Sequence, residues 1–401
     1  MKVNDIQINR IVDRVVDQLS GQSNETVPQA SHEDRREKKR PVEKPVKTAL
    51  KRGCFLSIEE AINAAEQAFI QFQATSLEKR KRIVQAIREI CLDHIEEISR
   101  IAVDETGLGR YEDKIEKNRL AIQKTPGVED VEPKAFTGDD GLTVEERAPF
   151  GIVGSITPTT NPSETIICNG IGIISGGNSV VFNPHPSAKK TSAFTIDLLN
   201  QAVISEGGPT NLFTMVSTPT IESAQAMMTH RKINLLVVTG GPAVVRVAMQ
   251  SGKRVIAAGP GNPPVVVDET ADLDKAGKDI VTSAGFDNNI ICVLEKEIIV
   301  TEKAADGLKK ALIRHGAVEL GQHQSRRLEK IILDGKYPNK KWVGKDIQKI
   351  LAEIGLSVSP EKRIAIVEAG PSHPFATTEL LMPVLPFIRV KDIDSAIELA
   401  Y

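Results

Sequence analysis

The chain has 401 residues, of which 40% are hydrophobic and 26% are charged, and its formal net charge is −2. This balance is typical of a globular protein, and the near-neutral charge argues against a general nucleic-acid binder. No apolar stretch approaches the length of a membrane span, and the length of the chain favours two domains.

The N-terminal 50 residues differ in composition from the rest. Residues 1–20 are predicted to form an amphipathic helix, because apolar residues recur at spacings of three and four. These residues are Ile8, Ile11, Val12, Val15 and Leu19. Residues 21–50 are rich in charge, Ser and Pro and predict a flexible linker. The apolar face could cover its own domain, a partner chain or a membrane, and the mixed-sign polar face favours a protein partner.

From residue 51 onward the composition is globular. Ser57 with Glu60, and Thr75 with Glu78, form two predicted capping boxes at helix starts. Farther on, apolar β-branched segments alternate with segments of helical periodicity. The apolar segments are 152–156, 179–182, 235–238, 264–267, 298–300 and 363–368, and the helical ones include 193–203, 221–228, 304–315 and 393–400. Such alternation predicts parallel sheets covered by helices on both faces, and hence an α/β fold with two doubly wound domains, 51–259 and 260–401.

Four cysteines are scattered along the chain, with no CxxC pair and no neighbouring histidine cluster: Cys54, Cys91, Cys168 and Cys292. We therefore expect no disulfide framework, no metal site and a reducing cytosol. Cys168 and Cys292 both have apolar neighbours, and either could be a nucleophile only if its thiolate were stabilised. Composition alone does not choose between them.

The standard glycine-rich dinucleotide fingerprint and the Walker loop are both absent from the sequence. The segment Thr239-Gly240-Gly241-Pro242 does follow a predicted strand and opens a predicted helix. Its backbone N–H groups could therefore face a pyrophosphate.

Seven short segments, in a fixed order along the chain, carry a resemblance to a known family. They are residues 156–162, 182–188, 238–241, 259–262, 271–275, 286–292 and 379–386. Together they show that residues 53–401 resemble the CoA-acylating aldehyde dehydrogenases of bacterial microcompartments, a branch of the aldehyde dehydrogenase superfamily. The resemblance implies NAD-dependent oxidation of acetaldehyde or propionaldehyde to the acyl-CoA, with coenzyme A as co-substrate.

The resemblance also assigns roles to residues. Cys292 matches the nucleophile, Asn161 the amide that binds the oxyanion, and Glu379 the carboxylate that holds the nicotinamide ribose. The residues that match the nucleotide cleft are Thr157, Pro184, His185, Thr239, Gly240 and Gly241. Two departures from the hydrolytic members point to the acylating branch. Ala258 stands where those members carry a water-activating glutamate, and Asn183 stands where they carry a lysine for the adenosine ribose.

The resemblance further implies that residues 1–20 bind microcompartment shell or cargo proteins, and that the protein works in the bacterial cytoplasm within a microcompartment. Members of the family continue beyond the position of Tyr401, so we expect the catalytic domain to be truncated and a homo-oligomer to form if the C-terminal tail is present. Three other functions stay open at this point: hydrolytic oxidation to a free acid, a non-catalytic cargo or scaffold role, and reduction of acyl phosphates. A requirement for CoA distinguishes the acylating enzyme from all three.

Overall fold

The structure is a computed structural model that describes residues 50–401. The predicted helix 1–20 and nearly all of the predicted linker 21–50 lie outside the described residues. Among the helices that are described, none has both the length and the hydropathy needed to cross a bilayer.

The first sheet consists of parallel strands in the order β1-β6-β5-β4-β7-β8. Their bounds are β1 (Cys54–Phe55), β4 (Ile152–Thr157), β5 (Ser179–Pro184), β6 (Phe213–Val216), β7 (Ile233–Thr239) and β8 (Arg254–Ala258). Every residue of β4 and β5 is buried, as near-continuous apolar runs predict for the centre of a parallel sheet. The predicted strands at 152–156, 179–182 and 235–238 are confirmed.

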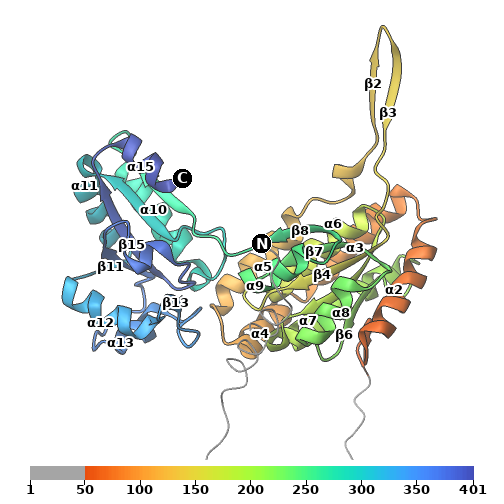
Figure 1. Ribbon diagram of the computed structural model, residues 1–401, viewed down its shortest axis with the longest axis horizontal. Helices are drawn as coiled ribbons and strands as arrows, with labels where there is room; N and C mark the ends of the chain where they lie inside the picture. Colours follow the sequence, from red (N-terminus) through yellow and green to blue (C-terminus); the bar gives the residue numbers. More distant parts are fainter. Residues whose placement is uncertain (1–49) are drawn as a thin grey trace, which may run out of the picture. The chain divides into compact units, whose positions relative to one another are not determined.

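Helices cover both faces of this sheet (Figure 1). Along β5, Val180 and Phe182 pack into one apolar cluster and Val181 into another, because successive side chains point to opposite faces of a strand. The first cluster includes helices α3 (Leu77–Asp93), α4 (Ile95–Thr106), α5 (Tyr111–Lys124), α6 (Pro162–Ser175) and α7 (Lys189–Ser205). The second includes α2 (Ile58–Phe72), α8 (Ile221–Thr229) and α9 (Pro242–Met249).

The second sheet is also parallel, in the order β11-β14-β15-β10-β9. Its strands are β9 (Pro264–Val267), β10 (Glu297–Thr301), β11 (Ala317–Leu320), β14 (Ile364–Glu368) and β15 (Val384–Val390). One face packs on α10 (Leu273–Ala284) and α11 (Glu302–Arg314), and the other on α12 (Gln322–Ile332), α13 (Ile347–Ala352), α14 (Pro374–Thr377) and α15 (Ile393–Ala400). The sheet thus has the doubly wound form that the alternation predicts, and both sheets together give the predicted α/β fold.

Two helix starts test the predicted capping boxes. The Ser57 hydroxyl accepts from the Glu60 N–H and the Glu60 carboxylate accepts from the Ser57 N–H, both at 3.2 Å, so this box is confirmed. The box at Thr75 is wrong by one residue, because Ser76 caps α3 by accepting from the Lys79 N–H at 3.3 Å. The Thr75 N–H instead bonds to the Phe72 carbonyl and closes the preceding turn.

A hairpin of β2 (Lys134–Gly138) and β3 (Gly141–Glu145) was not predicted from the sequence. All its residues are exposed, so the hairpin has no buried face. The periodicity of a buried face is the sequence pattern that predicts a strand. It extends away from the first sheet as an arm (Figure 1). The shorter elements are β12 (Leu333–Asp334), β13 (Tyr337–Pro338) and the 3-10 turns Val128–Val131, Pro186–Ala188 and Phe286–Asn289.

Candidate active site

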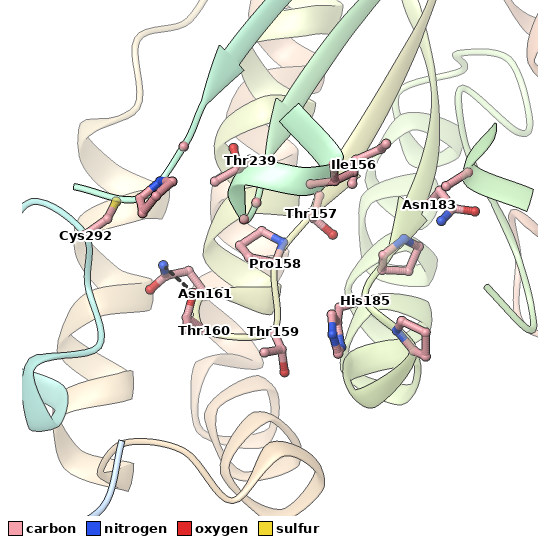
Figure 2. A pocket seen from close by; sticks show the side chains of 18 of the residues that line it. Ile156, Thr157, Pro158, Thr159, Thr160, Asn161, Asn183, His185, Thr239 and Cys292 are labelled. Atoms are coloured by element: carbon pink, nitrogen blue, oxygen red, sulfur yellow. Dashed lines mark hydrogen bonds between the residues drawn. The ribbon is translucent and has the colours of Figure 1, made fainter. Parts of the chain in front are cut away.

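A cavity of about 350 Å³ opens where β4, β5 and β7 end (Figure 2). Open α/β sheets bind ligands at the carboxyl ends of their strands, and the volume lies within the range of small-molecule sites. All nine residues that the resemblance selected line this cavity: Thr157, Asn161, Pro184, His185, Thr239, Gly240, Gly241, Cys292 and Glu379. The structure thus brings together groups that lie far apart in the sequence, from Thr157 to Glu379.

The turn that precedes Cys292 has an unusual backbone. Asp287, Asn288 and Asn289 have φ values of 46°, 54° and 62°, in the left-handed region that Asp and Asn tolerate better than most residues. Side chains hold the turn: the Asn288 amide donates to the Gly344 carbonyl at 2.9 Å, and the Asn289 amide donates to two backbone carbonyls. The Asp-Asn-Asn sequence therefore allows the left-handed turn that places Cys292 at the cavity.

The structure separates the two cysteines that composition left equivalent. Cys168 lies on α6, accepts a hydrogen bond from the Thr125 hydroxyl at 3.0 Å, and is not among the residues that line the cavity. Burial raises the pKa of the Cys168 thiol, which disfavours its thiolate. Cys292 is half-buried and lines the cavity beside Asn161 (Figure 2).

Asn161 lies at the start of α6, immediately before Pro162. Its side chain makes no capping bond to its own helix, although asparagine is a favoured cap. The amide oxygen instead accepts from the Lys117 ammonium at 3.0 Å, and the amide nitrogen contacts the Thr160 hydroxyl at 3.2 Å. Figure 2 shows that nitrogen on the side of the amide nearer the Cys292 sulfur.

The rest of the cavity suits a nucleotide. The Thr157 hydroxyl is buried and, within the described part of the chain, has no hydrogen-bond partner, so a ligand could supply one. Gly241 caps α9, and because Pro242 has no N–H, the helix start offers the N–H groups of Ala243 and Val244 to an anion. A Cβ atom at Gly240 would lie 2.7 Å from a Val244 methyl group, so a larger residue there would force the Val244 side chain to shift.

His185 presents a neutral ring to the cavity. Its Nδ1 accepts from the Ser187 N–H at 3.1 Å, which leaves the proton of a neutral imidazole on Nε2 as a donor. Burial, with a smaller effect of Lys340, lowers the pKa of His185 and favours that neutral form.

Glu379 is the only carboxylate among the described residues that line the cavity. Burial raises its pKa, and the nearby Lys296 and the Gly261 backbone oppose that shift. Ala258, which the resemblance matches to the glutamate of hydrolytic members, is the last residue of β8 and is not among the described residues that line the cavity; its carbonyl accepts from the Gly240 N–H at 3.1 Å. Asn183 lines the cavity, but its amide oxygen already accepts from the Ser223 hydroxyl at 2.6 Å.

Sequence reasoning missed two lysines that support the site. Lys296 donates to the Asn289 carbonyl and amide oxygens, both at 2.6 Å, and to the Ile291 carbonyl at 2.8 Å, and so braces the turn before Cys292. Burial lowers the pKa of Lys296 to about 8. In the sequence it stands between two glutamates, which is typical of a solvated surface. Lys117 lies among other charged residues of α5, and nothing local marks it as buried.

Comparison with known proteins identifies the class. The sequence model of the aldehyde dehydrogenase family matches residues 29–400. The chain therefore belongs to the aldehyde dehydrogenase family and is an oxidoreductase of that class.

Its relatives lie in the CoA-acylating branch. The acetylating acetaldehyde dehydrogenase EutE of Salmonella typhimurium is 49% identical over 360 residues, covering 88% of this chain and 77% of the relative. The CoA-propanoylating propanal dehydrogenase of the same species is 44% identical over 352 residues, covering 87% and 75%. The crystal structure of Rhodopseudomonas palustris propionaldehyde dehydrogenase with bound propionyl-CoA is 48% identical, with a TM-score of 0.84 over 87% of this chain and 78% of that one. These similarities confirm the resemblance to CoA-acylating aldehyde dehydrogenases.

Proposed function

We propose that this protein oxidises acetaldehyde or propionaldehyde with NAD and CoA, and forms the acyl-CoA and NADH. One observation carries the proposal: Cys292 and Asn161 line the same cavity, and its described lining offers one carboxylate, Glu379. The relatives that carry the acetylating and propanoylating names support the choice of aldehyde.

In this proposal the Cys292 sulfur attacks the aldehyde carbon, forming a C–S bond while the carbonyl electrons move to the oxygen. The Asn161 amide N–H and the Cys292 backbone N–H stabilise that negative oxygen, and comparable donors contribute about 3 kcal/mol each to the transition state. Collapse of the thiohemiacetal restores the C=O bond and expels hydride, which leaves a thioester on Cys292. When bound, NAD supplies the hydride acceptor.

The thioester on Cys292 persists because the described residues that line the site include no second carboxylate to activate water. It then transfers its acyl group to the CoA thiol: the new C–S bond forms, the bond to Cys292 breaks, and the overall reaction releases one proton. Ala258, the position that the resemblance assigns to the water-activating glutamate of hydrolytic members, has no side-chain group that could act as a base.

The fit to a nucleotide rests on the buried Thr157 hydroxyl, which has no hydrogen-bond partner among the described residues, and on the helix start at Gly241. Pro184, His185, Thr239 and Gly240 would form the remaining walls, and Glu379 would accept from the ribose hydroxyls. Asn183, whose amide is held by Ser223, leaves this wall without a cation. A weakly held nucleotide suits a cleft that serves first NAD and then CoA.

The direct test follows NADH absorbance with propionaldehyde and NAD, with and without CoA. Cys292→Ala should abolish NADH formation. Cys168→Ala, a matched change at the other half-buried cysteine, should retain it. Steady turnover without CoA would contradict the acylating proposal and favour hydrolysis. Loss of activity in Cys168→Ala alone would contradict the assignment of the nucleophile.

We also propose that residues 51–259 form the nucleotide-binding domain and 260–401 the catalytic domain, a division that the positions of β8 and β9 support. A solved relative comes from a fucose-utilisation microcompartment, which supports a place for this protein in such a compartment of the bacterial cytoplasm. Residues 1–20 would attach it to shell or cargo proteins, and the protein would also form homo-oligomers. Deleting residues 1–20 should leave the kinetics unchanged and abolish co-sedimentation with shells, and unchanged co-sedimentation would contradict this proposal.

A further inference from the structure

Four charged side chains form a buried cluster behind the cavity. Lys114 and Lys117 come from α5, Glu164 from α6, and Asp287 from the turn before Cys292. Their side chains are exposed by 0%, 7%, 7% and 0%, respectively, so the cluster is shielded from water. Two cations and two anions balance its charge, as a buried ionic cluster requires.

Lys117 is the member of this cluster that reaches the proposed oxyanion residue. Its ammonium lies 3.0 Å from the Asn161 amide oxygen and 3.0 Å from the Glu164 carboxylate, and it also contacts the Asp287 carboxylate. Lys114 contacts Asp287 at 3.0 Å and the Thr160 carbonyl at 3.4 Å, but makes no hydrogen bond to Asn161.

The cluster keeps Lys117 charged. Burial by itself would lower the pKa of Lys117, but the carboxylates of Glu164 and Asp287 outweigh it and raise the pKa. In contrast, burial and the neighbouring Lys117 lower the pKa of Lys114 to about 8. The cluster therefore keeps the Lys117 ammonium, which faces Asn161, in its charged form.

An ammonium donates hydrogen bonds and accepts none. The oxygen of the Asn161 amide must therefore face Lys117, and its NH2 group must point the other way, toward the side on which Figure 2 shows the Cys292 sulfur. Without Lys117 the amide could rotate by half a turn and present its oxygen to the cavity, where it would repel a developing oxyanion.

We infer that Lys117 is a positioning residue for aldehyde oxidation: it holds the Asn161 amide oxygen and so aims the amide N–H at the thiohemiacetal oxygen. The inference rests on the proposed roles of Cys292 and Asn161. It does not depend on CoA, because the step that it concerns precedes acyl transfer.

The test is a double-mutant cycle on the rate of NADH formation in a single turnover, with enzyme in excess over aldehyde and without CoA. Lys117→Met should slow this step about 100-fold, the size expected when a catalytic group is misplaced by about an ångström. The KM for NAD in steady-state assays with CoA should change little, because Lys117 is not among the residues lining the cavity. In an Asn161→Ala background the same Lys117→Met change should matter by no more than about twofold, since the group it positions is gone.

Lys114→Met is the matched control, because it removes a buried lysine from the same cluster without touching Asn161. Its effect on the rate should be the same in both backgrounds. If Lys117→Met fails to fold, the charge-balanced variant Lys117→Met/Glu164→Gln replaces it. The rate of that variant is then compared with the rate of Glu164→Gln alone. Thermal unfolding shows whether each variant is folded.

If the fold-losses in the rate of NADH formation from Lys117→Met and Asn161→Ala multiply in the double variant, the inference is overturned and Lys117 is a structural residue. An unimpaired Asn161→Ala variant would also overturn it, because there would be no oxyanion donor to position. These outcomes differ from failure of the proposed function, in which the wild-type protein itself forms no NADH with aldehyde and NAD, or turns over steadily without CoA.

Discussion

Replacing Asn161 by Asp and by Ala should separate its role as a hydrogen-bond donor from its role in the fold. The amide oxygen accepts from the buried Lys117 at 3.0 Å, and the NH2 group faces the cavity side. Aspartate keeps an acceptor for Lys117 but has no N–H for the oxyanion. Alanine removes both contacts.

The magnitudes follow from these contacts. Loss of one oxyanion donor costs about 10²–10³-fold in kcat, so both variants should fall by at least that factor. Asn161→Asp should fall further, because a carboxylate would repel the negative oxygen. Stability should rank the other way: Asn161→Ala leaves the Lys117 ammonium short of an acceptor, which costs about 1–3 kcal/mol, whereas aspartate retains this contact.

The assay combines NADH formation in a single turnover with urea unfolding of each variant. Alkylation of Cys292 by iodoacetamide, followed by peptide mass, checks that the nucleophile remains accessible. Retention of activity within about tenfold of wild type in Asn161→Ala would refute the oxyanion assignment. If Asn161→Asp is less stable than Asn161→Ala, the contact with Lys117 is not the reason why Asn161 contributes to stability.

Two further changes test the packing and the buried charges of the second sheet. Gly277→Ala would place a methyl group 2.6 Å from the Ala311 Cβ, so the variant should lose about 1–3 kcal/mol of unfolding free energy in urea. Its kcat/KM should be unchanged. A stability equal to wild type would contradict the close packing of α10 on α11. Burial raises the pKa of Glu297 from 4.5 to about 7, so between those values the folded state binds a proton that the unfolded state has released, and the contribution of Glu297 to stability should fall as pH rises from about 4.5 to about 7. In Glu297→Gln that part of the fall should vanish in thermal melts, and identical pH profiles of the two proteins would contradict the shift.

Local patterns in the sequence were sufficient to predict the alternation of parallel strands and helices along the chain. The apolar runs at β4, β5, β7 and β9 predicted parallel strands, because near-continuous apolar runs are typical of parallel sheets that helices cover on both faces. Strand β8 gave no comparable pattern, since most of its residues are exposed at the edge of the sheet. The start of α3 was misplaced by one residue because Thr75 and Ser76 are both good caps, and the turn before them decided which was used.

The candidate site divides in the same way. Its residues followed from ordered motifs, but composition could not choose between Cys168 and Cys292, and only the fold placed Cys292 in the cavity with Asn161.

The sequence by itself determined the alternation of strands and helices and the family to which the chain belongs, because periodicity and short motifs are local properties. Tertiary structure alone decided that Lys117 is buried, since its partners Asn161 and Asp287 lie 44 and 170 residues away. A lysine in a charged stretch is stable in the interior only where distant carboxylates compensate its lost hydration, and no local pattern records that they do.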